Sequence, residues 1–315
     1  MTTLSKAVLA PMPSPALTII IPTHNRPKML RRAVRSALAQ TLPDLGANLE
    51  IIVVDDGSEP PVALPEYPQV KVIRISPNRG GAAARNIGAK AAIAPLITYL
   101  DDDDELLPQM AQVSLEALSQ ATLPKPVGVL SALVEVDKKQ QIAKTHSPPT
   151  LAKGCHFCLE DIDLQHSFAS KQTLVVPRQV LLDIGGFDES FTSRVHTELF
   201  LRLNPVCSLL GVPTVTYRLT AHDGPRVSSG LEKREQNFRR LLEKHQTIFL
   251  SYPRRRYADF IFNHAYMLRR RGYPIAAAKA FLRALRVQPI QAIARLGSPY
   301  KTKLLKALRP RNLPT

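Results

Sequence analysis

Short apolar runs alternate with helical patterns in the first hundred residues. Ala16–Pro22 (ALTIIIP), Leu49–Val54 (LEIIVV) and Val70–Ile75 are rich in Ile and Val, as expected for strands covered on both faces. Between the first two runs, apolar residues recur at helical spacing from Met29 to Leu38, with arginines on the other side. The pattern predicts parallel strand–helix–strand winding and an α/β fold, in which ligands bind beyond the carboxyl ends of the strands.

Further elements follow along the chain. The sequence predicts a helix that opens in the stretch Asn78–Asn86 and runs to about Ala94. It also predicts strands over Pro95–Leu100 and Val127–Val136, a polar loop over Asp137–Pro149, a strand and helix over Leu174–Ile184, a short helix over Thr197–Leu203 and a strand over Val212–Arg218. Gly80 and Gly81 open the first of these helices, where free backbone N–H groups favour an anion. Their spacing is not G-x-G-x-x-G, which argues against a dinucleotide-dependent dehydrogenase.

Polar residues gather where the predicted strands end. Thr23–Asn25, Asp55–Ser58 and Asn78–Gly81 each follow a strand, so the topology brings them to one edge of the sheet. Asn25 also precedes Pro27, the favoured residue of a first helical turn, and we expect it to cap that helix.

An acidic run, Leu100-Asp-Asp-Asp-Asp-Glu105, follows the predicted strand 95–100. Like charges this close repel one another unless a cation neutralises them, and carboxylate oxygens suit Mg²⁺ or Mn²⁺. The alternative is an acidic helix start, because helical sequence follows Pro108. A cap needs one acid rather than four. We therefore predict a divalent metal site that serves the phosphates of a nucleotide diphosphate.

The composition argues against a disulfide-rich, a zinc-binding and a membrane-spanning protein. The 315 residues contain three cysteines, which favours a reducing, cytoplasmic location over a disulfide framework. The pair Cys155 and Cys158 has zinc-like spacing but lacks a second pair, so we expect ordinary thiols. No uncharged apolar run reaches the roughly 18 residues of a membrane span. Residues 1–15 are interpreted as a flexible tail rather than a signal peptide.

The positive charge is concentrated at the C-terminal end. From Pro225 onward the sequence has 21 Lys or Arg against 4 Asp or Glu, whereas the first 224 residues have 21 against 22. We predict a basic helical region over 230–315, with one tetratricopeptide-like unit over Tyr266–Pro289. Few aromatics are present for base stacking, so no nucleic-acid partner is expected. The basic helices either contact the anionic inner face of the membrane or pack on the preceding domain.

Taken in order, these stretches resemble a family 2 glycosyltransferase of the GT-A fold. The resemblance covers about 17–228 and rests on IIIPTHNR, EIIVVDDGS, NRGGAAARN, YLDDDDELLP, and GGFDES ahead of TELFLRL. It implies a Rossmann-like, mostly parallel sheet with helices on both faces over 16–229. It also implies inverting transfer from a UDP-, GDP- or dTDP-sugar to a glycan or lipid-linked acceptor, in envelope or polysaccharide synthesis.

The resemblance assigns roles to residues at the strand ends. Nucleotide-sugar binding is expected of Pro22, Thr23, His24, Asn25, Asp55, Arg85, Asp101, Asp102 and Arg226. Asp101 and Asp103 form the D-x-D pair, and Asp103 is the expected direct ligand of Mn²⁺ or Mg²⁺. His222 is expected to complete the coordination of the metal.

One position departs from the family pattern. The family carries Glu-Asp just ahead of an L-x-L-R helix, and that Asp deprotonates the acceptor; here the two places hold Val195 and His196. The base is then His196, or Glu198 two residues later, or the chain is an impaired, nucleotide-binding scaffold with a basic interaction tail. A nucleotidyltransferase would need a Gly- and Lys-rich phosphate loop near the first strand, and Pro22–Asn25 contains neither residue.

Overall fold

The computed structural model describes residues 14–42, 48–137, 139–220 and 230–297. The chain forms two compact units, Met1–Cys155 with Ile162–Pro225, and His156–Asp161 with Arg226–Thr315. Nearly all of the predicted N-terminal tail lies outside the described residues.

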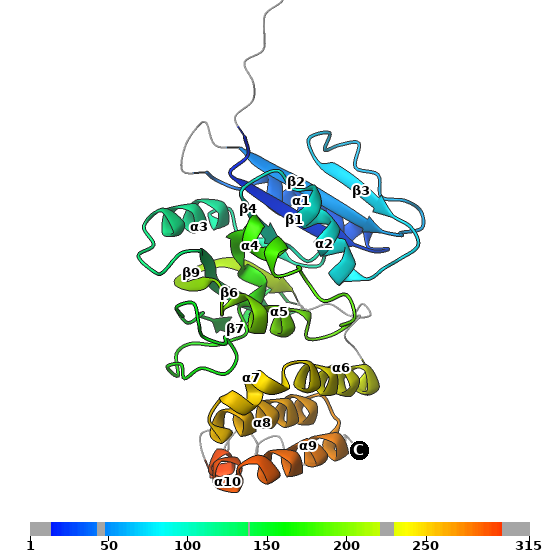
Figure 1. Ribbon diagram of the computed structural model, residues 1–315. Coiled ribbons are helices and arrows are strands. Elements are labelled where there is room, and N and C mark those ends of the chain that lie inside the picture. Colours follow the sequence, from blue (N-terminus) through cyan, green and yellow to red (C-terminus); the bar gives the residue numbers. More distant parts are fainter. Residues whose placement is uncertain (1–13, 43–47, 138, 221–229, 298–315) are drawn as a thin grey trace, which may run out of the picture. The chain divides into compact units, whose positions relative to one another are not determined.

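The first unit contains nine described strands and five α-helices (Figure 1). The strands are β1 (Leu17–Thr23), β2 (Leu49–Asp56), β3 (Lys71–Ile75), β4 (Leu96–Tyr99), β5 (Glu105–Leu106), β6 (Val127–Val136), β7 (Ile142–His146), β8 (Val175–Pro177) and β9 (Ser208–Thr220). The helices are α1 (Pro27–Leu38), α2 (Gly81–Ala91), α3 (Met110–Ser119), α4 (Arg178–Asp183) and α5 (Val195–Leu203), with a 3₁₀ turn, η1, at Lys171–Thr173.

These strands form one sheet in the order β3-β2-β1-β4-β8-β6-β9-β5, with β7 added beside β6. The first four are parallel neighbours, as are β6 and β9, whereas β8, β5 and β7 pair antiparallel. The α/β fold predicted from the sequence is confirmed. Because β1, β2 and β4 run parallel, their carboxyl ends meet at one edge, and this edge holds the polar segments.

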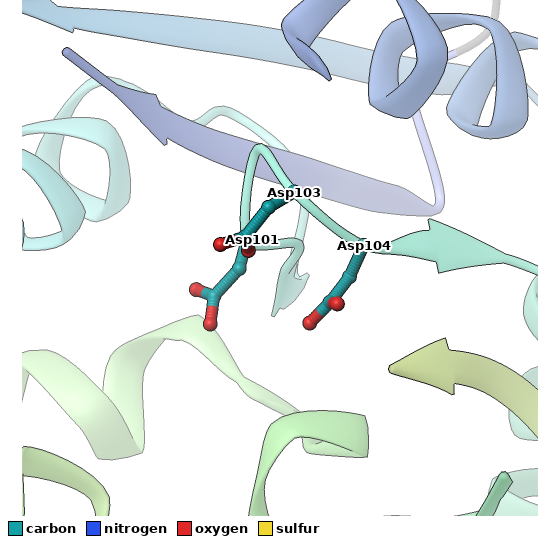
Figure 2. A group of neighbouring side chains, drawn as sticks. All are labelled: Asp101, Asp103 and Asp104. Carbon is teal, nitrogen blue, oxygen red and sulfur yellow. The ribbon is translucent and has the colours of Figure 1, made fainter. Parts of the chain in front are cut away.

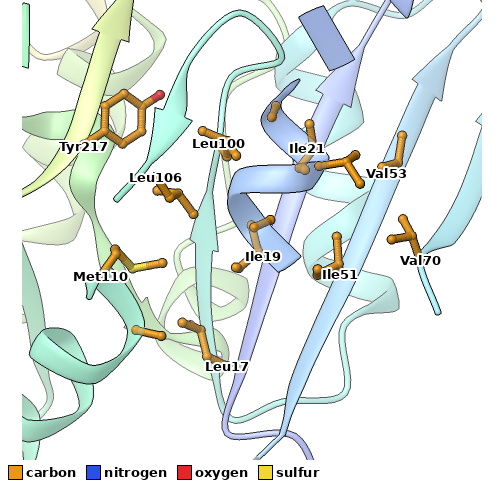
Figure 3. Packing of buried hydrophobic residues seen from close by; sticks show 14 of the residues in the cluster. Leu17, Ile19, Ile21, Ile51, Val53, Val70, Leu100, Leu106, Met110 and Tyr217 are labelled. Atoms are coloured by element: carbon orange, nitrogen blue, oxygen red, sulfur yellow. The ribbon is translucent and has the colours of Figure 1, made fainter. Parts of the chain in front are cut away.

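Helices cover both faces of the parallel strands. Ile19 and Ile21 of β1 point to one side and pack in a core with the apolar residues of α1 (Figure 3). Ile20 and Val54 point to the other side, against α2. There a Cβ on Gly88 would lie 2.3 Å from Cγ2 of Ile20, so α2 approaches the sheet closely enough to require glycine.

Three local predictions were wrong. The predicted polar loop 137–149 contains β7, whose mostly exposed residues give no apolar signal and which is held by backbone pairing with β6. Helix α2 ends at Ala91, earlier than expected. Asn25 does not cap α1, because its Oδ1 accepts a hydrogen bond from the backbone N–H of Glu59, at 2.7 Å, and the cap position is Arg26.

The second unit is helical. It comprises α6 (Leu231–Lys244), α7 (Gln246–Ser251), α8 (Arg254–Arg270), α9 (Pro274–Val287) and α10 (Pro289–Gly297). A short turn joins α8 to α9, and the two helices pack through Ala265, Leu268, Ala277 and Ala280. Over the residues described here, no helix combines the length and apolar character needed to cross a membrane.

Candidate active site

The acidic run forms a tight turn between β4 and β5 (Figure 2). Asp101, Asp103 and Asp104 each place one carboxylate oxygen within 4.8 Å of the others. Asp102 points elsewhere, because it accepts hydrogen bonds from Oγ1 of Thr23 at 2.7 Å and from Arg26 at 3.0 Å. Three of the four aspartates therefore form the cluster, and the fourth anchors the turn to the end of β1.

The environment of the cluster suits a divalent cation. Asp104 is buried and accepts hydrogen bonds from the Tyr217 hydroxyl at 2.8 Å and the Thr220 N–H at 2.9 Å. Burial, together with the charges of Asp101 and Asp103, raises its pKa well above the ordinary value. A bound Mn²⁺ or Mg²⁺ would relieve this repulsion, and three carboxylates supply the hard oxygen ligands that such ions prefer.

Arg85 of α2 forms an ion pair with Asp101, the first residue of the D-x-D pair. Its Nη2 donates to Asp101, its Nη1 donates to the Gly81 carbonyl at 3.0 Å, and its guanidinium lies 5.6 Å from the centre of the Phe187 ring. Burial would raise the pKa of Asp101, but the charge of Arg85 holds it below the ordinary value. The Nε of Arg85 and the Tyr99 hydroxyl are buried without hydrogen-bond partners among the described residues. These two groups are therefore available for hydrogen bonds with a bound ligand.

Sequence reasoning missed Arg26 as a site residue. Its Nη1 donates to both Asp102, at 3.0 Å, and Asp103, at 2.9 Å. It follows Asn25 directly in the polar turn after β1, and the position could have been noticed because a cation there faces the acidic run across the parallel strands.

The segments expected to hold the nucleobase lie together, and hydrogen bonds join them to one another. Pro22 is buried at the end of β1. Nδ1 of His24 lies 2.8 Å from the Asp56 carbonyl, and the backbone N–H of Asn25 donates to Oγ of Ser58 at 3.0 Å. Both side chains are exposed, so their remaining surface faces solvent at the edge of the sheet.

Asp55 is 1% exposed, and its carboxylate accepts three hydrogen bonds inside the chain. The donors are the N–H groups of Ser58, at 2.8 Å, and Val62, at 3.0 Å, and the guanidinium of Arg74, at 3.0 Å. In the structure Asp55 shapes the turn after β2, and direct contact with a nucleobase stays a prediction.

The neighbouring Asp56 is a second residue that sequence reasoning missed. Its two carboxylate oxygens accept the backbone N–H groups of Arg79, at 2.7 Å, and Gly80, at 2.8 Å. It thereby fixes the loop that leads into α2 and to Arg85. The signal was the second acid of the DDGS motif, which follows a buried strand just as Asp55 does.

The two candidate bases differ sharply in environment. Glu198 is 0% exposed and binds Arg202, which in turn donates to the carbonyls of Ile184, at 2.5 Å, and Gly186, at 2.8 Å. Glu198 thus secures the glycine turn before α5. His196 instead packs edge-on against the Phe187 ring, with centroids 5.4 Å apart.

His196 is neutral near pH 7. Burial and the positive charges of Arg85 and Lys171 lower its pKa to about 3, although the Asp101 carboxylate acts in the opposite direction. These interactions place the imidazole in the same electrostatic environment as the D-x-D pair and Arg85.

Asn86 positions Phe187, and sequence reasoning gave it no role. Its Nδ2 donates to the Phe187 carbonyl and its Oδ1 accepts the Phe187 N–H, each at 2.8 Å. Gly186 has a φ of +68°, and a Cβ there would lie 2.4 Å from Oδ1 of Asn86. The glycine is therefore required for Asn86 to hold the ring that contacts Arg85 and His196.

The remaining two predicted site residues, His222 and Arg226, lie outside the described residues.

Comparison with known proteins points to one family. The model of glycosyl transferase family 2 matches residues 18–147, which include β1, β2, α2 and the acidic turn. Residues 18–147 therefore match glycosyl transferase family 2, and the resemblance seen in the sequence is confirmed.

Two relatives illustrate the range of similarity. An uncharacterized glycosyltransferase of Rickettsia prowazekii is 26% identical over 316 residues, which cover 96% of this chain and 94% of that protein. The succinoglycan biosynthesis protein ExoO of Rhizobium meliloti is 35% identical over 112 residues, which cover 34% of this chain and 31% of that protein.

Solved structures agree on the fold. The crystal structure of S. aureus TarS 1-349 in complex with UDP-GlcNAc superposes with a TM-score of 0.64 at 17% identity. The superposition covers 88% of this chain and 83% of that one. At this level of identity the likeness defines the fold, which is GT-A.

Proposed function

We propose that this protein transfers a sugar from a nucleotide-diphosphate sugar to an acceptor hydroxyl, with inversion at the anomeric carbon and with the help of Mn²⁺ or Mg²⁺. The observation that carries the proposal is the joint placement of three carboxylates and Arg85 at the carboxyl edge of the parallel strands. Ligands of α/β sheets bind at this edge. The carboxylates are available there for a metal, and Arg85 is available for a diphosphate.

Asp103, with Asp101 and Asp104, would hold the metal. When bound, such an ion supplies a positive charge that stabilises the departing nucleotide diphosphate. Arg85 is placed to bind the diphosphate through its guanidinium, and Asp101 orients Arg85 through their ion pair. The exposed residues His24 and Asn25 border the region proposed for the nucleobase.

We assign the base to His196 rather than Glu198. A base must reach the acceptor hydroxyl, and Glu198 is fully buried and engaged by Arg202. Burial is the main cause of the pKa of about 3 of His196, and the charge of Arg85 lowers it further. Negative charge on a bound diphosphate would offset the charge of Arg85 and so favour proton uptake by the imidazole.

The class of donor is supported by a structural neighbour. The TarS crystal structures are titled as complexes with UDP-GlcNAc and with UDP, so we test UDP-sugars first, ahead of GDP- and dTDP-sugars. The similarity to a succinoglycan biosynthesis protein supports a glycan or lipid-linked acceptor in polysaccharide synthesis. We place this activity in the cytoplasm.

The proposal is tested by binding and turnover in parallel. The unfolding temperature is measured with UDP-, GDP- and dTDP-sugars, with and without Mn²⁺, because a bound ligand stabilises the folded state. Release of nucleotide diphosphate is then followed with the donor that binds. Asp103→Ala is compared with Asp163→Ala, which removes a carboxylate that is 81% exposed and outside the cluster.

Binding and turnover that are lost in Asp103→Ala and kept in Asp163→Ala support the transferase. Metal-dependent binding without turnover in any acceptor mixture supports the impaired, nucleotide-binding scaffold instead. Absence of binding by all three classes of nucleotide sugar contradicts both.

A further inference from the structure

Helix α9 exposes two large aliphatic side chains to solvent, while three of its alanines face the interior. Ala277, Ala280 and Ala284 are buried, at 7%, 7% and 0% exposure. Ile275 and Leu282, two turns apart on the opposite face, are 74% and 53% exposed. A helix that packs on its own protein has the reverse arrangement, because burying large aliphatic residues is what stabilises the contact.

Helix α10 repeats this arrangement. Ala292 is 1% exposed, while Ile290 and Ile293 are 78% and 59% exposed. The helix is oriented by polar contacts to Asp259 of α8, which accepts hydrogen bonds from Arg295, at 2.7 and 2.8 Å, and from Gln291. Because these contacts set the orientation of α10, Ile290 and Ile293 are held on its exposed side.

The exposed face of α9 is also positively charged. Lys279, Arg283 and Arg286 lie on the exposed side of α9, beside Ile275 and Leu282 at helical spacing. The sequence from 274 to 297 contains no Asp or Glu. Within the described part of the chain, these three cations have no carboxylate partner.

We propose that the exposed face of α9 and α10 binds an anionic phospholipid bilayer. This face is defined by Ile275, Lys279, Leu282, Arg286, Ile290 and Ile293. A surface that alternates aliphatic side chains with cations and lacks acids matches the boundary between acyl chains and anionic headgroups. An uncharged apolar protein surface would match the aliphatic residues but not the cations, and a nucleic acid would match the charge but not the aliphatic residues.

Not every large apolar residue of α9 lies on this face. Phe281 packs against the cluster that joins α8 and α9 and is only partly exposed. Leu282, Ile290 and Ile293 lie on the surface, so the proposed lipid-facing residues belong to α9 and α10.

The test is flotation of the full chain with vesicles of phosphatidylcholine alone and of phosphatidylcholine with phosphatidylglycerol. We expect flotation with the anionic vesicles at low salt and much less with neutral ones or at high salt. Lys279→Gln with Arg286→Gln should weaken binding by about fivefold per charge removed. Ile290→Ser with Ile293→Ser should weaken it by about tenfold or more at every salt concentration.

The matched control is Ile142→Ser, which replaces an isoleucine that is 66% exposed on β7 of the other unit. It should float as the unaltered chain does. Light scattering of the same samples reports whether a second copy covers the face. Failure of the full chain to bind anionic vesicles at low salt overturns the proposal, as does equal flotation of all variants. A dimer that the Ile290 and Ile293 changes dissociate, without flotation, also overturns it.

Donor binding by all variants is measured by thermal shift, so a failure of the lipid test is distinguishable from a failure of the proposed transferase activity.

Discussion

Glu198 and Arg202 lie one turn apart on α5, and two hydrogen bonds of 2.8 and 2.5 Å join their side chains. Arg202 extends the connection to the carbonyls of the turn before Phe187. The acid that survives near the family's base position is therefore a support for the turn. His196, two residues earlier, stays the residue that we propose as the base.

Glu198→Gln should lower the stability of the fold rather than change the chemistry. The substitution leaves the Arg202 guanidinium without its buried counter-charge, and breaking such a pair typically costs about 3–5 kcal/mol. Urea unfolding measures this loss. The pH dependence of turnover should keep its shape in molecules that remain folded, and a shifted acid limb with normal stability would return Glu198 to the role of base.

His196→Ala should reduce turnover by about 10²–10⁴-fold, the usual contribution of a general base. His196→Asp restores the residue that the family pattern has at this place and should recover a large part of the rate. The measurement is the initial rate of nucleotide diphosphate release under saturating donor. Full activity in His196→Ala would remove this residue from the mechanism.

The free energy of unfolding should decrease as the pH is lowered, because of His196. Its pKa is about 3 in the folded chain and about 6.5 when unfolded, so the unfolded state binds more protons between these values. Stability due to this group is complete above pH 6.5 and is lost as the pH falls toward 3, by at most about 1.4 kcal/mol per pH unit. The asparagine in His196→Asn does not bind a proton in this range, so the free energy of unfolding of this variant should decline less between pH 6.5 and 4.5. Parallel curves for the two proteins would contradict the assigned pKa.

Asp103→Ala should abolish transfer with little effect on folding, whereas Asp101→Ala should also destabilise the chain. Asp103 pairs with Arg26, which retains Asp102 as a partner, but Asp101 is the counter-charge of the buried Arg85. Thermal unfolding of both variants, with and without Mn²⁺, separates the effects. An unchanged Mn²⁺-dependent shift in Asp103→Ala would show that this residue is not a ligand.

The sequence by itself determined the α/β class and most elements, because the apolar runs of β1 and β2 and the helical spacing in α1 are local signals that survive folding. The six motifs in order also indicated the family, and the acidic run at Asp101–Asp104 indicated the candidate metal site.

Only the tertiary structure decided how the side chains within these motifs divide their roles. Asp102 turns to Thr23, Asp55 is occupied by backbone donors, and Glu198 is buried against Arg202. Thr23 lies 79 positions from Asp102 and is brought close by the parallel winding, whereas Ser58 and Arg202 lie three and four positions from Asp55 and Glu198 and are placed by a turn and a helix. The orientation of α9, with alanines inward and isoleucine outward, was likewise decided by packing against α8. A hydrophobic pattern records which residues are apolar, but the depth to which each is buried depends on the surface that the neighbouring element offers.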